Sequence, residues 1–166
     1  MSSLRHVLRN HVEYNAWATG RLLKASGELT EDEKKRDFGT ADKTVLGTLV
    51  HLFRSERTWL QRLQFGIPKI PWAVPEDEDW FYLTEQWPHL HHDWQAWAAN
   101  LAEQDTDRII DYSDLKGRPW SQPVWPLVLH VVNHSTHHRG QVSGFLRALG
   151  HAPPPLDFIA FVREQK

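Results

Sequence analysis

Histidine is unusually frequent in this sequence, and its side chain is the one best suited to chemistry here. There are eleven histidines and nine tryptophans among the 166 residues, and there is no cysteine. Imidazole binds divalent transition metals, whereas the lack of cysteine excludes thiolate ligands, disulfides and a cysteine nucleophile. Any metal bound by this chain must therefore be held by nitrogen and oxygen atoms.

The densest group of histidines lies near the C-terminal end, where His130, His134, His137 and His138 fall within nine residues. On a helix, side chains four positions apart are neighbours, so the pairs 130/134 and 134/138 can each converge on one ion. His130 and His138 cannot share an ion, because the helix rises about 12 Å between them.

The apolar pattern of this segment favours His134 and His138 as the inward pair. They fill the gap in a helical seam formed by Leu127, Val131, Val142, Phe145 and Leu149. His130 and His137 share a different line on the flank of the helix. Burying two imidazoles in an apolar seam costs free energy unless they find a partner, and we favour a metal ion over hydrogen bonds within the core.

A third ligand must come from another helix, and periodicity alone leaves two candidates. His51 has apolar neighbours in sequence, although its own helical line is small and polar, with Thr44, Thr48, Ser55 and Thr58. His11 lies on the inward stripe of its helix with Leu4, Leu8, Asn15, Ala18 and Leu22. A further group, His89, His91 and His92, is interpreted as a solvated face.

Two charged residues near these histidines have alternative interpretations. Glu56 lies about one turn beyond His51, where it would orient a ligand or accept a proton. A surface charge paired with a nearby arginine is the favoured interpretation for this residue. Arg139 would either hold an anionic group of a substrate or cap the end of its helix. The sequence identifies no catalytic side chain beyond the candidate ligands.

Four amphipathic segments must position these residues. Apolar residues near the helical period predict helices over residues 4–25, 44–64, 84–102 and 126–149. Pro88 interrupts the third segment, so we expect that helix to begin near Trp87. Four helices of these lengths, without an internal repeat, predict an all-α four-helix bundle in a single domain spanning residues 1–166.

The connections between the helices differ in character. Residues 26–42 are predicted to form a loop with one short helical turn, capped by Thr30 and Glu33. Residues 68–79 contain three prolines and an acidic cluster, which predict an irregular crossing connection. Residues 108–112 and 118–122 predict at most one short β-hairpin between the third and fourth helices. A short final turn is expected after Pro155.

Composition argues against two kinds of partner. The formal net charge is −2, so the chain lacks the positive charge that neutralises phosphates along nucleic acid. No stretch approaches the roughly 18 apolar residues that a membrane-spanning helix needs. The N-terminal residues show no secretion signal, and we expect a cytoplasmic location.

Three stretches of the sequence resemble the DinB/YfiT-like family of metalloenzymes. They are YNAW at residues 14–17, TLVHL at 48–52 with the following Trp59-Leu60, and NHSTHHRGQ at 133–141. The match spans nearly the whole chain in the right order, and the last motif is the most specific. The resemblance implies an up-down-down-up four-helix bundle that holds one divalent metal ion, nickel or zinc, through His51, His134 and His138. The choice of His51 over His11 comes from this resemblance.

The resemblance also implies an activity. Family members resemble S-transferases or isomerases that use bacillithiol or mycothiol, and homodimers are common among them. Three histidines leave a coordination position open, and the thiol must be a foreign low-molecular-weight cosubstrate because the chain has no cysteine. We therefore expect a metal-dependent transferase that attacks a small-molecule electrophile and forms a homodimer, with the tryptophans either at its interface or in the core. The alternatives are a metal-dependent hydrolase and a non-enzymatic, metal-stabilised stress-response binding protein.

Overall fold

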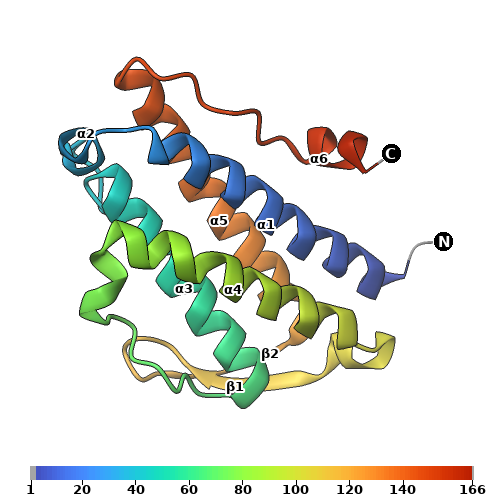
Figure 1. The fold of residues 1–166 in the computed structure, drawn as a ribbon. Helices are drawn as coiled ribbons and strands as arrows, with labels where there is room; N and C mark the ends of the chain where they lie inside the picture. Colours follow the sequence, from blue (N-terminus) through green and yellow to red (C-terminus); the bar gives the residue numbers. More distant parts are fainter. Residues whose placement is uncertain (1–2, 166) are drawn as a thin grey trace.

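Four long helices carry most of the chain in the computed structural model, which describes residues 3–165. They are α1 (Leu4–Gly27), α3 (Val45–Phe65), α4 (Trp80–Asn100) and α5 (Val124–Ala148). Helices α1 and α5 run in one direction, and α3 and α4 run in the opposite direction (Figure 1). The predicted all-α bundle with up-down-down-up topology is confirmed.

Side-chain caps fix where α1 and α3 begin. The hydroxyl of Ser3 accepts a hydrogen bond from the His6 amide at the start of α1, and Thr44 accepts one from Gly47 at the start of α3. Such caps satisfy amide groups that have no partner within the helix. At the far end of α3, Gly66 adopts a φ of 77°, and its amide donates to the Arg62 carbonyl. The Thr44 cap and Gly66 thus define the two ends of α3, the helix that carries His51.

Helix α4 begins earlier than the sequence predicts. We expected residues 84–102 with a start near Trp87, but the helix begins at Trp80 and contains Pro88. The side chain of Asp79 caps it by accepting a hydrogen bond from the Tyr82 amide at 2.7 Å. Pro88 is exposed, while Leu83 and Trp87 are fully buried. The cap and the apolar burial thus outweigh the single backbone hydrogen bond that proline removes.

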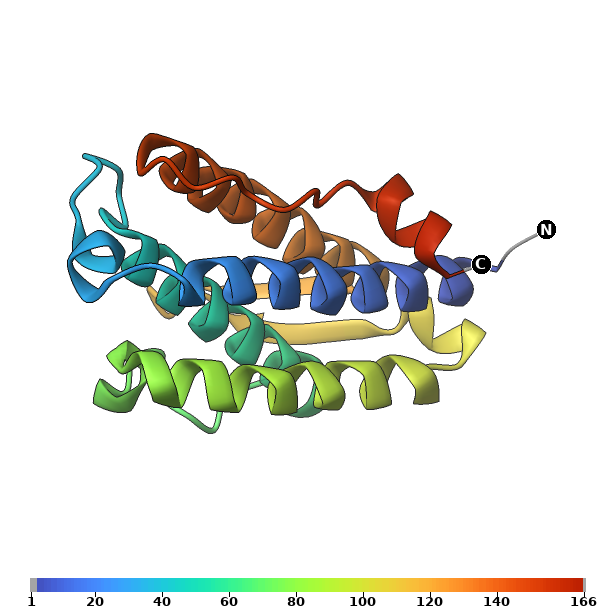
Figure 2. The same ribbon diagram turned by 45° about the horizontal axis from the view of Figure 1, so that its top comes forward.

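Short elements connect the long helices. Helix α2 (Glu31–Lys35) begins with the predicted capping box of Thr30 and Glu33. The strands β1 (Ile109–Ser113) and β2 (Pro119–Pro123) form the predicted antiparallel hairpin, in which Tyr112 lies opposite Trp120. Two 3-10 helices, η1 (Pro75–Glu78) and η2 (Glu103–Asp107), flank α4. The expected final turn is helix α6 (Phe158–Glu164), and Figure 2 shows the segment before it running back along the bundle.

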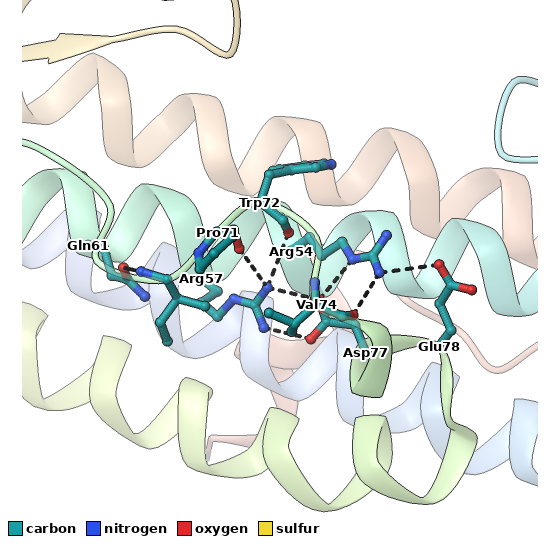
Figure 3. A network of polar contacts seen from close by, with 9 residues as sticks. Arg54, Arg57, Gln61, Pro71, Trp72, Val74, Asp77 and Glu78 are labelled. Atoms are coloured by element: carbon teal, nitrogen blue, oxygen red, sulfur yellow. Dashed lines mark hydrogen bonds and ion pairs between the residues drawn. The ribbon is translucent and has the colours of Figure 1, made fainter.

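The crossing segment between α3 and α4 is held by two arginines of α3 (Figure 3). The carboxylate of Asp77 is fully buried and accepts hydrogen bonds from Arg57 at 2.6 and 2.9 Å and from Arg54 at 2.8 Å. Burial would raise the pKa of Asp77, but the hydrogen bonds from both arginines lower it below its ordinary value. Arg57 also donates to the Trp72 carbonyl. This network places Trp72 beside His51, with a ring distance of 5.7 Å.

The hydrophobic core lies between the four long helices. Its fully buried side chains come from all four and include Leu8, Leu22, Leu49, Leu52, Leu63, Leu83, Trp87 and Leu146. Each such side chain contributes about 1.5–3 kcal/mol relative to an exposed position. Among residues 3–165, no helix is long and apolar enough to cross a membrane.

Candidate metal centre

Three histidines from two helices converge at one point of the bundle. His51 lies on α3, and His134 and His138 lie one turn apart on α5. One ring nitrogen from each lies within 4.8 Å of the others. The Nε2 atoms of His51 and His134 are 3.2 Å apart. In a tetrahedral site with metal–nitrogen bonds of 2.0–2.1 Å, two ligating nitrogens lie about 3.3 Å apart, so this pair already has a suitable spacing.

Each of the three rings has a polar partner on its Nδ1 side. His138 Nδ1 lies 2.8 Å from Oε1 of Gln141, and His134 Nδ1 lies 3.5 Å from the Ser55 hydroxyl. His51 Nδ1 lies 3.6 Å from the carboxylate of Asp42. Metal-binding histidines commonly have such a partner on the nitrogen that faces away from the ion, because it fixes the tautomer and the ring orientation. The arrangement leaves the Nε2 atoms available as ligands.

The electrostatics of the site favour the neutral form of His134 and His138. Burial, followed by the nearby His138 and His51 rings, lowers the pKa of His134 to about 4. Burial also lowers the pKa of His138. His134 is therefore unprotonated near neutral pH, the form in which imidazole binds a metal.

A cavity of about 590 Å³ opens beside the three histidines. It includes His51, and the rest of its wall comes from the loop before α3, from α3 itself and from the crossing segment: Lys35, Asp42, Thr44, Leu46, Gly47, Val50, Arg54, Trp72 and Glu78. The volume is in the range of small-molecule sites, and the wall combines an aromatic ring with charges of both signs. His51 is thus accessible from one side through a polar cavity.

The other candidate histidines lie elsewhere. His11 bonds to the Val7 carbonyl at 2.8 Å and stacks on Phe158 of α6. His130 packs edge-on against Trp59 with its ring 5.8 Å from that of His134, and His137 is exposed. Within residues 3–165, the candidate metal-binding group contains none of the three.

The interpretation of Glu56 as a surface charge is wrong. Its side chain is fully buried and accepts hydrogen bonds from Asn15, Trp87, His91 and Ser135 at 2.7 to 3.0 Å. His91 is likewise buried rather than solvated, whereas His89 and His92 are exposed. A signal was present in the sequence, because Glu56 continues the apolar stripe of its helix, which contains Leu49, Leu52, Leu60 and Leu63.

The interpretation of Arg139 as a cap for the end of its helix is wrong. The side chain is 1% exposed and belongs to the interior of α5 rather than to its end. It borders a separate cavity together with Tyr14 and Phe158, and a role in holding an anionic substrate group stays a prediction. Its guanidinium donates to Asn15, Thr19 and Thr136. Since Asn15 also donates to Glu56, a buried polar network links α1, α3, α4 and α5 immediately beside the histidine cluster. This network holds α3 and α5 in the relative position that the cluster requires.

The family of the chain follows from a comparison with known proteins. A family model described as the DinB family matches residues 1–166. The chain belongs to the DinB family. This membership confirms the family resemblance seen in the sequence motifs.

Individual DinB relatives are distant in sequence. Protein DinB of Bacillus subtilis (strain 168) is 22% identical over 156 residues, which cover 88% of each chain. "Uncharacterized protein YizA" of the same organism is 23% identical over 151 residues, covering 89% of this chain and 91% of that protein. The crystal structure of a DinB-like protein from Bacillus cereus ATCC 10987 matches with a TM-score of 0.63 at 19% identity, covering 86% and 91% of the two chains. At that identity the structural match supports the fold alone.

Proposed function

We propose that His51, His134 and His138 bind one divalent cation, nickel or zinc, and that the protein is a metal-dependent transferase. In this proposal an external low-molecular-weight thiol attacks a small electrophilic substrate. The observation that carries the proposal is the convergence of three ring nitrogens within 4.8 Å beside a cavity of about 590 Å³. Membership of the DinB family is compatible with it.

The donor set suits a reactive site. Three histidine nitrogens leave at least one coordination position for a non-protein ligand, which is typical of catalytic rather than structural sites. Within residues 3–165, the candidate group contains no fourth side chain that would close the site. This favours an enzyme over a non-enzymatic protein in which the metal only stabilises the fold.

Different residues of the chain would bind the cation and contact the substrate. When bound, the cation supplies a Lewis acid that lowers the pKa of a coordinated thiol, and the thiolate is the reactive form. The three imidazoles would hold the cation, and His51 is the one of them that lines the cavity. Trp72 provides an apolar surface above His51, and the polar groups of the wall would orient the substrate. The sulfur must come from a second molecule, because the chain contains no cysteine.

Thiol dependence tests this function. The purified protein, loaded with zinc or nickel, would be incubated with a panel of small electrophiles, with and without a low-molecular-weight thiol. We expect turnover to require both the thiol and the metal and to stop when a chelator is added. Turnover that continues unchanged without thiol would favour the hydrolase instead, with water as the nucleophile.

A further inference from the structure

We propose that Asp42 is a positioning residue of the metal centre, whose carboxylate orients His51 and His138 together. This inference rests on the proposed binding of a metal by the three histidines. The Asp42 oxygens lie 3.6 Å from His51 Nδ1 and 3.8 Å from His138 Nδ1. Both separations are within ion-pairing range and beyond hydrogen-bonding range. One carboxylate therefore faces rings that come from two different helices.

Asp42 lies on the side of the rings that faces away from the proposed ion. Its oxygens approach the Nδ1 atoms, and Asp42 is not part of the group of three that could hold a metal. A carboxylate beside Nδ1 favours the tautomer that carries its proton there, which leaves the lone pair on Nε2 for the metal. His138 Nδ1 also has Oε1 of Gln141 at 2.8 Å, so Asp42 is its second, more distant polar neighbour. The third ligand, His134, has Ser55 in the corresponding place.

The backbone around Asp42 is built to hold it against the first turn of α3. Lys43 has a φ of 61°, a left-handed conformation that is uncommon for a residue with a side chain. The Thr44 amide donates to the Asp42 carbonyl at 2.7 Å. A Cβ atom on Gly47 would lie only 2.3 Å from that carbonyl oxygen, so this close approach requires glycine. Such strain often marks a functional position.

The charge of Asp42 is directed at the histidines rather than at a basic side chain. Within residues 3–165, the basic nitrogens that approach its carboxylate within 4.0 Å are those of His51 and His138, and these contacts are ion pairs only when the imidazole is protonated. Glu78 lies in the wall of the same cavity, but its carboxylate is paired with Arg54 at 3.3 Å. The two acidic groups therefore differ in their contacts, although both line one cavity. This difference makes Glu78 a matched control for Asp42.

Metal affinity tests the role of Asp42. Isothermal titration of the metal-free protein with Zn²⁺ would compare the wild type with Asp42→Ala, Asp42→Asn and Glu78→Gln. Loss of a partner on the outer nitrogen of a histidine ligand weakens metal binding by about 10–100-fold, and we expect a loss in this range for Asp42→Ala. Asp42→Asn removes the charge at almost constant volume and should also weaken binding. Glu78→Gln should leave the affinity nearly unchanged.

A spectroscopic signature separates positioning of the ligands from a general effect on folding. The visible absorption spectrum of the Co²⁺-loaded protein reports the geometry around the ion, and it should change in Asp42→Ala but not in Glu78→Gln. Gly47→Ala should change it as well, because the added methyl group displaces the Asp42 carbonyl while every ligand is retained. Circular dichroism would establish which variants are folded. If Asp42→Ala does not fold, Asp42→Asn is used for the test in its place.

The outcomes for the two proposals are distinguishable. If the wild type binds Zn²⁺ and the folded Asp42 variants bind it with the same affinity and show the wild-type Co²⁺ spectrum, the role of Asp42 is overturned and the metal site stands. If the wild type itself binds neither Zn²⁺ nor Co²⁺, the proposed function fails, and the role of Asp42 fails with it.

Discussion

Glu56 is the common acceptor for several side chains of the buried polar network. Its carboxylate accepts four hydrogen bonds from side chains on α1, α4 and α5. In Glu56→Gln, an amide group would face at least two of these donors, and the buried partners would lose the negative charge. We expect a loss of about 3–5 kcal/mol in the free energy of unfolding, measured by urea denaturation. Glu85→Gln, on the exposed face of α4, is the control and should change stability by less than about 0.5 kcal/mol.

The same residue predicts how stability depends on pH. Burial alone would raise the pKa of Glu56, but the interactions with His91 and the hydrogen bonds from Trp87 and Asn15 hold it at about 2, below its ordinary value of 4.5. Because the folded-state pKa is the lower one, the contribution of Glu56 is fully present above about pH 4.5 and is lost as the pH falls from there towards 2. The free energy of unfolding should therefore fall more steeply between about pH 5 and 3 in the wild type than in Glu56→Gln. Equal slopes would contradict this account.

The positions of some functional side chains could be predicted from the sequence, and those of others could not. The spacing of His134 and His138 predicted that both would face inward, and the structure brings them together. The partners of Glu56 could not be read in the same way, because periodicity describes one helix at a time and these partners lie on three other helices. The choice between His51 and His11 met the same limit, because it depends on which helix faces α5 at the level of His134 and His138. Only the family resemblance supplied that information.

At the scale of elements, the crossing segment between α3 and α4 depends on one buried ion-pair cluster. Asp77 is fully buried, and Arg57 and Arg54 are mostly buried beside it. Asp77→Asn would leave Arg57 without a carboxylate partner and Arg54 with only the exposed Glu78, so we expect a loss of about 3–5 kcal/mol in stability. Limited proteolysis should also cut residues 66–79 more readily. Glu76→Gln, one position away and exposed, should show neither effect.

Helix boundaries show where local patterns were sufficient. The capping box at Thr30 and the β-hairpin were predicted correctly, because the residues that form them are close together in sequence. The start of α4 was predicted incorrectly, because Pro88 is a stronger local signal than the cap at Asp79. The helix forms nevertheless because its first turns bury Leu83 and Trp87 in the core, which is an effect of tertiary packing.

At the scale of the whole molecule, the fold class could be predicted, because four long amphipathic helices have few ways to bury their apolar faces. The up-down-down-up topology was implied by the family resemblance alone. The single domain spanning residues 1–166 stays a prediction, and so does the homodimer. Trp87 and Trp94 belong to the core, whereas Trp120 and Trp125 are exposed on or beside the β-hairpin. The tryptophans are therefore divided between the core and the surface.

We expect the protein to be a homodimer in solution. The exposed Trp120 and Trp125 are suitable for an interface, because large aromatic side chains are enriched where subunits meet. Sedimentation equilibrium at micromolar concentration should give twice the chain mass of 19.4 kDa. A monomeric mass at that concentration would show that this expectation is wrong.

The central claim is that His51, His134 and His138 hold one metal ion, and elemental analysis of the purified protein tests it most directly. The wild type should contain about one nickel or zinc ion per chain. His51→Ala and the double variant His134→Ala, His138→Ala should lose most of it, because removing ligating nitrogens leaves too few donors for the ion.

The neighbouring histidines provide the matched controls for this measurement. His130→Ala and His137→Ala remove imidazoles from the same helix but lie outside the group of three, so both variants should keep nearly full occupancy. Loss of metal from the double variant alone would agree with the account. Stoichiometric metal retained by the double variant His134→Ala, His138→Ala would contradict it.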